Sequence, residues 1–246
     1  GGSRVRPEAT VYGTVYFAQH MLAEKGEKIA GKVVALSGFG NVAWGAAQKL
    51  VQLGAKVVTI SGPDGYIYDE KGLTQEGVDY MLELRASNND VVAPYAEKFG
   101  AKFFPKANPW EVKCDLAFPC AIQNELNEDD AKKLVANGCQ MIVETSNMGC
   151  TAEAVRYANE HITFAPGKAA NAGGVATSGL EQSQNSLRLS WTFEEVDERL
   201  HKIMIDIFAK AADAAERYGV PGNYVAGANI AGFEKVVEAM IAQGIV

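Results

Sequence analysis

The feature that most constrains the fold is a glycine-rich turn that joins an apolar run to a helical pattern. The run KVVALSGFG begins at Lys32 and ends in glycine, and NVAWGAAQKLVQLG follows it with apolar residues at helical spacing as far as Gly54. AKVVTI then provides a second apolar run and closes a unit of about 30 residues, the length of a βαβ crossover. Such crossovers join parallel strands and are right-handed in nearly all proteins. The sequence therefore predicts a sheet that begins with parallel strands.

The small residues of this turn match a dinucleotide-binding fingerprint. Gly38 permits a tight turn, Gly40 lets the backbone approach a pyrophosphate, and Ala43 lets the helix pack closely on the strand. A GxGxxA string alone is weak evidence, but a position between strand and helix gives it weight, because helix N-terminal amides favour an anion. The alternative is a glycine turn that binds no nucleotide. The residues expected to contact a coenzyme diphosphate are Gly38, Phe39, Gly40, Asn41 and Val42.

The segment after the second apolar run bears on the choice of coenzyme. In NAD-binding domains an acid near the end of the second strand commonly accepts hydrogen bonds from the adenine ribose. Here glycine occupies that place, Asp64 follows two residues later, and no arginine or lysine lies between Lys56 and Lys71. This pattern favours NAD, with NADP as the alternative, and it predicts coenzyme contacts from Ser61, Pro63 and Asp64. A plain surface turn is the competing interpretation of Pro-Asp-Gly.

The rest of the chain alternates between helical and strand patterns. Helices are expected before the first strand, from Pro7 to Leu22, across residues 74–87 and in PYAEKFG, and strands in AKFF and CDLAFP. NEDDAKKLVANG is a predicted helix with Asn127 as its cap and Gly138 as its stop, followed by strand CQMIVE, helix TAEAVRYANE and strand ITFAP. This order predicts an α/β fold, a doubly wound Rossmann-type sheet, mostly parallel, with flanking helices.

Two later helical patterns, residues 192–219 and 230–243, are expected to form a C-terminal helical extension outside the sheet. No internal repeat or long linker interrupts the chain. We therefore expect a single dinucleotide-binding domain over 1–246, with a Rossmann-type core at about 31–190, C-terminal helices at about 191–246, and a domain boundary before residue 1.

Composition excludes several classes of function. The net charge of −7 comes from 30 acids and 23 bases scattered along the chain, which predicts no nucleic-acid partner. No apolar run approaches the ~20 residues that span a bilayer, so no membrane partner and a cytoplasmic location are expected. The three histidines are far apart in sequence, and no metal site is expected. The four cysteines, Cys114, Cys120, Cys139 and Cys150, lack close CxxC spacing and are interpreted as reduced packing thiols.

Five strings, in order along essentially the whole chain, resemble one family. They are RPEAT at 6–10, GFGNVA at 38–43, PCAIQNE at 119–125, APGKAANAGGVATSGLE at 165–181 and NYVAGANIAGF at 223–233. Together they resemble hexameric bacterial-type glutamate dehydrogenase, and the PGKAANAGG string is far more specific than the nucleotide fingerprint.

This resemblance implies the coenzyme-binding domain of an enzyme that catalyses reversible NAD(P)-dependent oxidative deamination of L-glutamate to 2-oxoglutarate and ammonia. A preceding domain, absent here with its GGxKGG motif, would bind glutamate and supply the catalytic lysines and aspartate, so no catalytic residue is expected in this chain. The full-length protein would be a homohexamer, and the chain alone would bind coenzyme without turnover. The alternatives are a branched-chain or aromatic amino-acid dehydrogenase, and a catalytically silent nucleotide-binding module.

The resemblance also implies roles for particular residues. Thr10 and Asn147 would contact the nicotinamide end of the coenzyme, Asn124 would lie beside the nicotinamide ribose, and Asn171 would line the same pocket. Val175 and Ser178 would face the glutamate side chain, with Arg6 as a further substrate-side candidate. The NAGG cluster has another interpretation, because helix caps and close backbone contacts use the same residues.

Three features stand apart from these assignments. Lys168 is interpreted as an ordinary loop lysine without a catalytic role. Val11 stands where the family string RPEATG has glycine, and Gly149-Cys150 replaces the usual proline-threonine after NM.

Overall fold

A five-stranded parallel sheet forms the centre of the computed structural model, which describes residues 2–244. Its strands are β1 (Val33–Leu36), β2 (Lys56–Val57), β6 (Leu116–Phe118), β7 (Met141–Val143) and β8 (Thr163–Ala165), in the order β2-β1-β6-β7-β8. The chain runs outward from β1 to β2 and returns to β6 on the other side of β1. The switch in direction therefore lies between β1 and β6, where doubly wound sheets bind ligands at the carboxyl ends of their strands.

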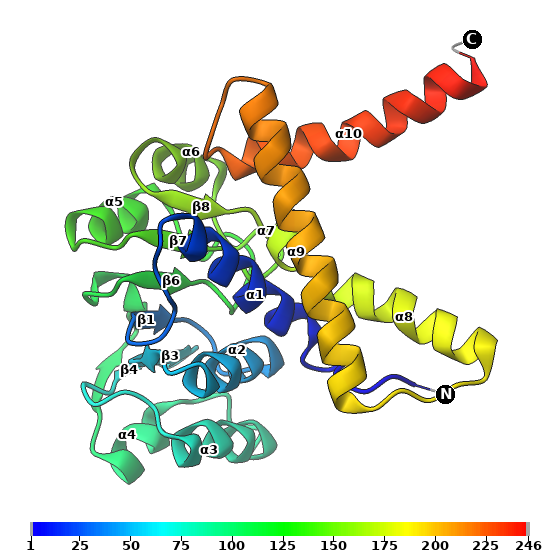
Figure 1. Cartoon of the computed structure of the whole chain (residues 1–246). Coiled ribbons are helices and arrows are strands. Elements are labelled where there is room, and N and C mark those ends of the chain that lie inside the picture. The colour runs from blue at the N-terminus through cyan, green and yellow to red at the C-terminus, as the bar shows by residue number, and fades with distance from the viewer. Residues whose placement is uncertain (1, 245–246) are drawn as a thin grey trace.

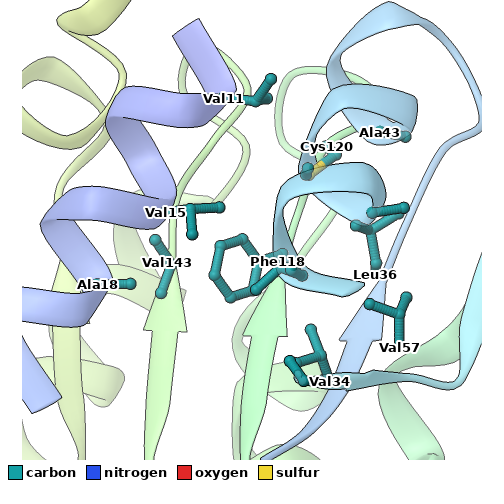
Figure 2. Close-up of a cluster of buried hydrophobic side chains, with 14 of the residues drawn as sticks. Val11, Val15, Ala18, Val34, Leu36, Ala43, Val57, Phe118, Cys120 and Val143 are labelled. Atoms are coloured by element: carbon teal, nitrogen blue, oxygen red, sulfur yellow. The ribbon is translucent and has the colours of Figure 1, made fainter. Parts of the chain in front are cut away.

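Helices cover both faces of this sheet (Figure 1). On one face lie α1 (Ala9–Glu24) and α2 (Asn41–Gln52), and on the other lie α5 (Glu128–Ala136) and α6 (Ala152–His161). Alternate strand residues enter the two cores, since Val34 and Leu36 pack with α1 and α2 whereas Ala35 packs with α5 and α6. Figure 2 shows Val15 and Ala18 of α1 near Phe118 and Val143. The predicted doubly wound α/β class is confirmed.

Local sequence signals set the ends of several helices. Helix α5 begins with a capping box in which the Asn127 side chain accepts from Asp130 N and the Asp130 carboxylate accepts from Asn127 N. Gly138 has a φ of 85° just beyond the end of α5, as its predicted role as a stop requires. Thr74 caps α3 (Gln75–Ala86), and Gly100 ends α4 (Ala93–Phe99) in a left-handed conformation.

A second, antiparallel sheet corrects the predicted alternation. AKVVTI does not form one strand: β2 ends at Val57, and β3 (Thr59–Gly62) pairs with β4 (Gly65–Tyr68), which pairs in turn with β5 (Lys102–Pro105), the predicted AKFF strand. Gly62 pairs with Gly65 across a two-residue turn, Pro63-Asp64. Gly65 has a φ of 143°, and a Cβ there would overlap the Phe104 carbonyl oxygen. The hairpin diverts the chain from the parallel sheet because its turn reverses the strand direction.

The last part of the chain is helical. It comprises α7 (Gly167–Ala170), α8 (Gly173–Leu187), α9 (Phe193–Arg217) and α10 (Tyr224–Gln243), of which α7 and α8 were not predicted, and a 3-10 turn, η1 (Pro109–Glu111), precedes β6. Helix α9 begins with a capping box at Thr192 and buries Val196, Leu200 and Met204 at helical spacing. Figure 1 shows α8 and the far half of α10 projecting from the body. No helix within residues 2–244 combines the length and apolar character needed to cross a membrane.

Candidate functional site

The turn after β1 lies at the switch point, where contacts with both sheets fix its position. Gly38 has a φ of 81°, and a Cβ there would lie 3.1 Å from Cys120 O. Its N–H donates to Ser61 Oγ at 2.8 Å, and Ser37 Oγ accepts from Cys120 N at 2.9 Å. Both the backbone conformation and the close neighbour require glycine at position 38.

Gly40 has a different environment. It caps the start of α2 with φ −71° and ψ −171°, a conformation open to any residue, and a Cβ there would meet no atom within 4 Å. The first turn of α2 contains no acidic residue, and the first N–H groups of a helix have no acceptor within the helix. Neither packing nor backbone conformation therefore requires glycine at position 40. Ala43, by contrast, is fully buried and packs in the main core.

The other predicted residues of this turn are placed as follows. Asn41 is the first residue of α2 and is exposed, whereas Phe39 is buried and Val42 is half-buried against the main core. Arg85 of α3 donates a hydrogen bond from Nη1 to Asn41 Oδ1. A guanidinium therefore stands at the N-terminus of α2. Arg85 lies outside the interval from Lys56 to Lys71, in which the sequence places no further cation, and packing of α3 beside α2 brings it to this turn.

The Pro63-Asp64 segment is a hairpin turn, as the competing interpretation of Pro-Asp-Gly held. The Asp64 carboxylate is also engaged, since it accepts hydrogen bonds of 3.0 Å from Val92 N and Ala93 N at the start of α4. Ser61 is buried and holds Gly38 rather than projecting freely. Asp64 is therefore fixed in place by α4, and the amide dipoles partly balance its charge. Coenzyme contact by Ser61, Pro63 and Asp64 stays a prediction.

Three predicted asparagines lie in the loops after β6, β7 and β8. Asn171 Nδ2 donates to Asn147 Oδ1 at 2.9 Å. Asn124, which has a left-handed φ of 55°, donates from its N–H to Met148 O at 2.8 Å. These loops follow the carboxyl ends of adjacent strands, the edge at which the glycine turn also lies.

A buried acid that the sequence argument overlooked organises these loops. Glu144, directly after β7, accepts hydrogen bonds from Cys150 N at 3.0 Å and from Gly167 N at 2.8 Å. A Cβ on Gly149 would lie 2.5 Å from Ser146 Oγ, so glycine fits where the family string has proline. The only sequence signal for Glu144 is an acid at the end of an apolar run.

The NAGG glycines bring α8 against α1. A Cβ on Gly173 would overlap Ala9 O, and a Cβ on Gly174 would overlap Thr10 Oγ1. Close packing against α1 therefore requires both glycines, against backbone at Gly173 and against a side chain at Gly174. Because these two glycines have no side chain, α8 approaches α1 closely. Thr10, which is half-buried in the first turn of α1, therefore lies beside the start of α8.

The three substrate-side candidates lie near one another. Arg6 Nε donates to Ser178 Oγ at 2.9 Å, and Val175, one turn earlier in α8, is 73% exposed. Because the Ser178 oxygen accepts this bond, its hydroxyl proton is available for another acceptor. Lys168, which was assigned no role, binds Asn229 Oδ1 at 2.7 Å and so links α7 to α10.

A titratable carboxyl near the glycine turn was also missed. Glu125 is half-buried, and its carboxylate accepts a hydrogen bond from Ala121 N at 2.8 Å. Burial raises the pKa of Glu125 to about 7, although hydrogen bonds from Ser37 and the backbone oppose the shift. Glu125 belongs to the PCAIQNE string, so its motif was recognised but its own side chain was given no function.

The remaining candidate ligands do not converge. All four cysteines are buried and free, and burial raises the pKa of Cys120 and of Cys150. Within residues 2–244, no group of three or more histidine, cysteine, aspartate or glutamate side chains is arranged to hold a metal ion.

Comparison with known proteins matches nearly the whole chain to one family. The model of the Glutamate/Leucine/Phenylalanine/Valine dehydrogenase family matches residues 1–244. The chain is 61% identical to an NAD-specific glutamate dehydrogenase of Bacteroides fragilis, over all of this chain and 56% of that protein. It is 56% identical to an NAD-specific glutamate dehydrogenase of Clostridium symbiosum, over 55% of that protein, and 53% identical to an NADP-specific one of Haemophilus influenzae, also over 55%.

Solved structures agree with this comparison. A glutamate dehydrogenase structure 56% identical to the chain superposes with a TM-score of 0.97, covering all of this chain and 56% of the other. The Plasmodium falciparum glutamate dehydrogenase superposes with a TM-score of 0.95 at 43% identity, over 53% of its chain. The chain thus spans a little over half the length of the relatives it matches.

Proposed function

The chain belongs to the Glutamate/Leucine/Phenylalanine/Valine dehydrogenase family, and from this membership we propose that it is the coenzyme-binding domain of a glutamate dehydrogenase. The proposed reaction is reversible NAD(P)-dependent oxidative deamination of L-glutamate to 2-oxoglutarate and ammonia. Within a family whose description covers four amino acids, relatives named glutamate dehydrogenase at 61% and 56% identity favour glutamate over leucine, phenylalanine and valine.

The observation that carries the proposal is the contrast between two glycines of one turn. Gly38 is required by the fold itself, whereas Gly40 caps α2 in an ordinary conformation with open space before it. A glycine that the protein's own packing does not require, at the N-terminus of a helix and at the switch point of a doubly wound sheet, suits a backbone that a diphosphate approaches closely.

We assign the nicotinamide end of the coenzyme to the loops after β6, β7 and β8. Thr10, Asn124, Asn147 and Asn171 would orient it there, and Arg6, Val175 and Ser178 would lie toward the glutamate side chain. When bound, the nicotinamide accepts the hydride from the substrate α-carbon. The tasks of this chain are to fix the coenzyme's position and to form one wall of the cleft that excludes water.

NAD is the coenzyme that we propose. Support comes from the NAD-specific relatives at 61% and 56% identity, with the NADP-specific relative at 53% as the counterexample. Asp64 opposes a phosphate on the adenine ribose through its charge, whereas Arg85 at the start of α2 attracts phosphate. Arg85 touches the first residue of α2, so we assign its attraction to the diphosphate, which both coenzymes share.

The catalytic lysines and aspartate are assigned to a separate substrate domain, because the relatives are nearly twice as long as this chain. In the complete protein, we propose, the two domains close on the substrate and six copies associate. Soluble expression with that domain and measurement of the oligomeric mass would test the last point.

Calorimetric titration with NAD tests the proposal directly. The parent chain should bind NAD, and Gly40→Val should lose binding because its side chain fills the space before the helix N-terminus. Gly232→Val is the matched control, since Gly232 of α10 also has no atom within 4 Å of a built Cβ and lies far along the chain from the turn. Unchanged affinity in a folded Gly40→Val protein would exclude the turn as the diphosphate site.

A further inference from the structure

Two of the four buried cysteines stand opposite each other at the amino ends of neighbouring strands. In the parallel ladder, Leu116 of β6 pairs with Met141 of β7, and a hydrogen bond of 2.8 Å from Gln140 N to Asp115 O continues the ladder one step. One more step back along both strands brings Cys114 opposite Cys139. Adjacent strands lie about 4.7–4.9 Å apart, and a disulfide joins Cα atoms about 4.4–6.8 Å apart.

The two cysteines also share one buried environment. Both residues are 3% exposed and pack in the same core, on the face covered by α5 and α6. The interaction between the two thiols raises the pKa of Cys114 and lowers that of Cys139. Cys139 Sγ also lies 3.3 Å from Met141 O and 3.6 Å from Asp115 O. Cys139 is therefore the thiol of the pair that ionises more readily.

Both cysteines border cavities that open at the amino-terminal edge of the sheet. Cys114 lines a cavity of about 320 Å³ together with Lys56 and Lys113. Cys139 lines a separate cavity of about 470 Å³ together with Lys25 and His161. A water molecule takes about 30 Å³ in the liquid, so a small peroxide fits in either space. Glu70 and Asp115 also line the first cavity, so acidic and basic side chains are balanced in number around Cys114.

We propose that Cys114 and Cys139 form a reversible disulfide when a small peroxide oxidant reaches them, which makes this edge of the sheet a redox modification site. The Cys139 thiolate attacks one peroxide oxygen, the O–O bond breaks, and the leaving hydroxide takes a proton to become water. The resulting sulfenic acid then reacts with the Cys114 thiol: an S–S bond forms and a second water leaves. Two thiols lose two electrons and two protons, and one peroxide is reduced to two waters.

The disulfide would close a covalent ring from Cys114 to Cys139, which includes β6, α5 and the connection between them. That connection carries Asn124 and Glu125. The oxidised protein would therefore have a cross-link between β6 and β7, the two strands from which coenzyme-side loops arise. Cross-links stabilise a fold chiefly by restricting the unfolded chain. Oxidation should therefore raise Tm, and dithiothreitol should reverse the rise.

The test is titration of the folded protein with limiting hydrogen peroxide, followed by catalase, thiol counting after denaturation, and peptide mapping. Cleavage before Asp115 by endoproteinase Asp-N separates Cys114 from Cys120, and cleavage after Glu144 by endoproteinase Glu-C separates Cys139 from Cys150. We expect a loss of two of the four thiols, a single Cys114–Cys139 cross-link, and full recovery with dithiothreitol. Four intact thiols, or a cross-link between any other pair, would overturn the proposal.

Variants separate the paired thiols from the others. Cys114→Ser should form no disulfide and should instead accumulate a Cys139 sulfenic acid that dimedone traps. Cys139→Ser should retain its three thiols at the same peroxide dose. Cys150→Ser is the control, because Cys150 is equally buried but lies outside the pair, and it should lose the same two thiols as the parent. A disulfide that persists in Cys114→Ser would also overturn the proposal.

Discussion

Val11 of α1 fits against α2 because residue 45 is glycine. Val11 is 1% exposed, and a Cβ on Gly45 would lie 2.5 Å from Val11 Cγ2. The valine at the position where the family string RPEATG has glycine is thus accommodated by the small residue that it faces. The departure does not disturb α1, which carries Thr10 into the site.

This pair predicts a reversal of sign in a mutant cycle. Gly45→Ala should lower the free energy of unfolding, because overpacking costs about 1–3 kcal/mol against about 1 kcal/mol gained in helix propensity. In a Val11→Ala background the same substitution should be stabilising, since the opposing methyl group is gone. Urea denaturation of the four proteins measures both values. Additive effects would show that the two side chains do not compete for space.

Asp64→Lys should improve NADP binding by about 1–2 kcal/mol, because it replaces repulsion of the ribose phosphate with attraction at a partly exposed site. It should also cost about 1 kcal/mol of stability, since the carboxylate that caps α4 is lost. Asp64→Asn is the matched control, because it removes the charge and keeps a capping oxygen. Titrations with NAD and NADP, with Tm for each variant, check both effects. If the parent chain binds NADP more tightly than NAD, the role assigned to Asp64 is wrong.

Arg85→Met should weaken binding of NAD and of NADP alike, by about 0.5–1 kcal/mol, because a partly exposed guanidinium near the diphosphate contributes as a screened charge. The effect should shrink as salt is raised. Arg156→Met is the control, since Arg156 is an exposed arginine on α6 at the other face of the sheet. Equal losses in both variants would indicate a general effect of net charge.

Glu125 should make stability depend on pH. Its folded pKa of about 7 lies above the ordinary value of 4.5, so between these values the folded protein keeps a proton that the unfolded chain has released. The resulting stabilisation is complete below about pH 4.5 and is lost as the pH rises through 7. Glu125→Gln should therefore lessen the decline in Tm between pH 5 and pH 8. The same decline in parent and variant would place the titrating group elsewhere.

The chain alone should not deaminate glutamate at a measurable rate. Arg6 and Ser178 offer one cation and one hydroxyl to a substrate with two carboxylates and an ammonium group, and a missing acid–base group costs about 100- to 10,000-fold in rate. A coupled NADH assay with and without the substrate domain of a relative, added in trans or fused, measures the difference. Steady NADH production by the chain alone, abolished by Gly40→Val, would require catalytic residues within it.

The spacing of apolar residues along the chain, together with its cap and turn residues, determined the parallel sheet and most of its helices. The strand, turn and helix around Gly38 and the capping box at Asn127 are local signals, because each depends on residues within a few positions of one another. Long recognisable strings likewise indicated the family, and two of these strings contain Asn124 and Asn171. Each lies beside a strand end whose place in the sheet follows from the alternation.

Tertiary structure alone decided what meets at the site. Because of the hairpin at Pro63-Asp64, β3 and β5 pair with β4 and not with the parallel sheet. Which strands pair depends on tertiary contacts that the pattern of one segment does not specify. Arg85 reached Asn41 from α3, and Glu144 joined Cys150 to Gly167, through contacts between residues from 6 to 44 positions apart. The raised pKa of Glu125 arises from burial beside Ser37. Cys114 and Cys139 lie opposite each other because of the register between β6 and β7. Burial and strand register are properties of the packed molecule, so they could not be predicted from patterns along the sequence.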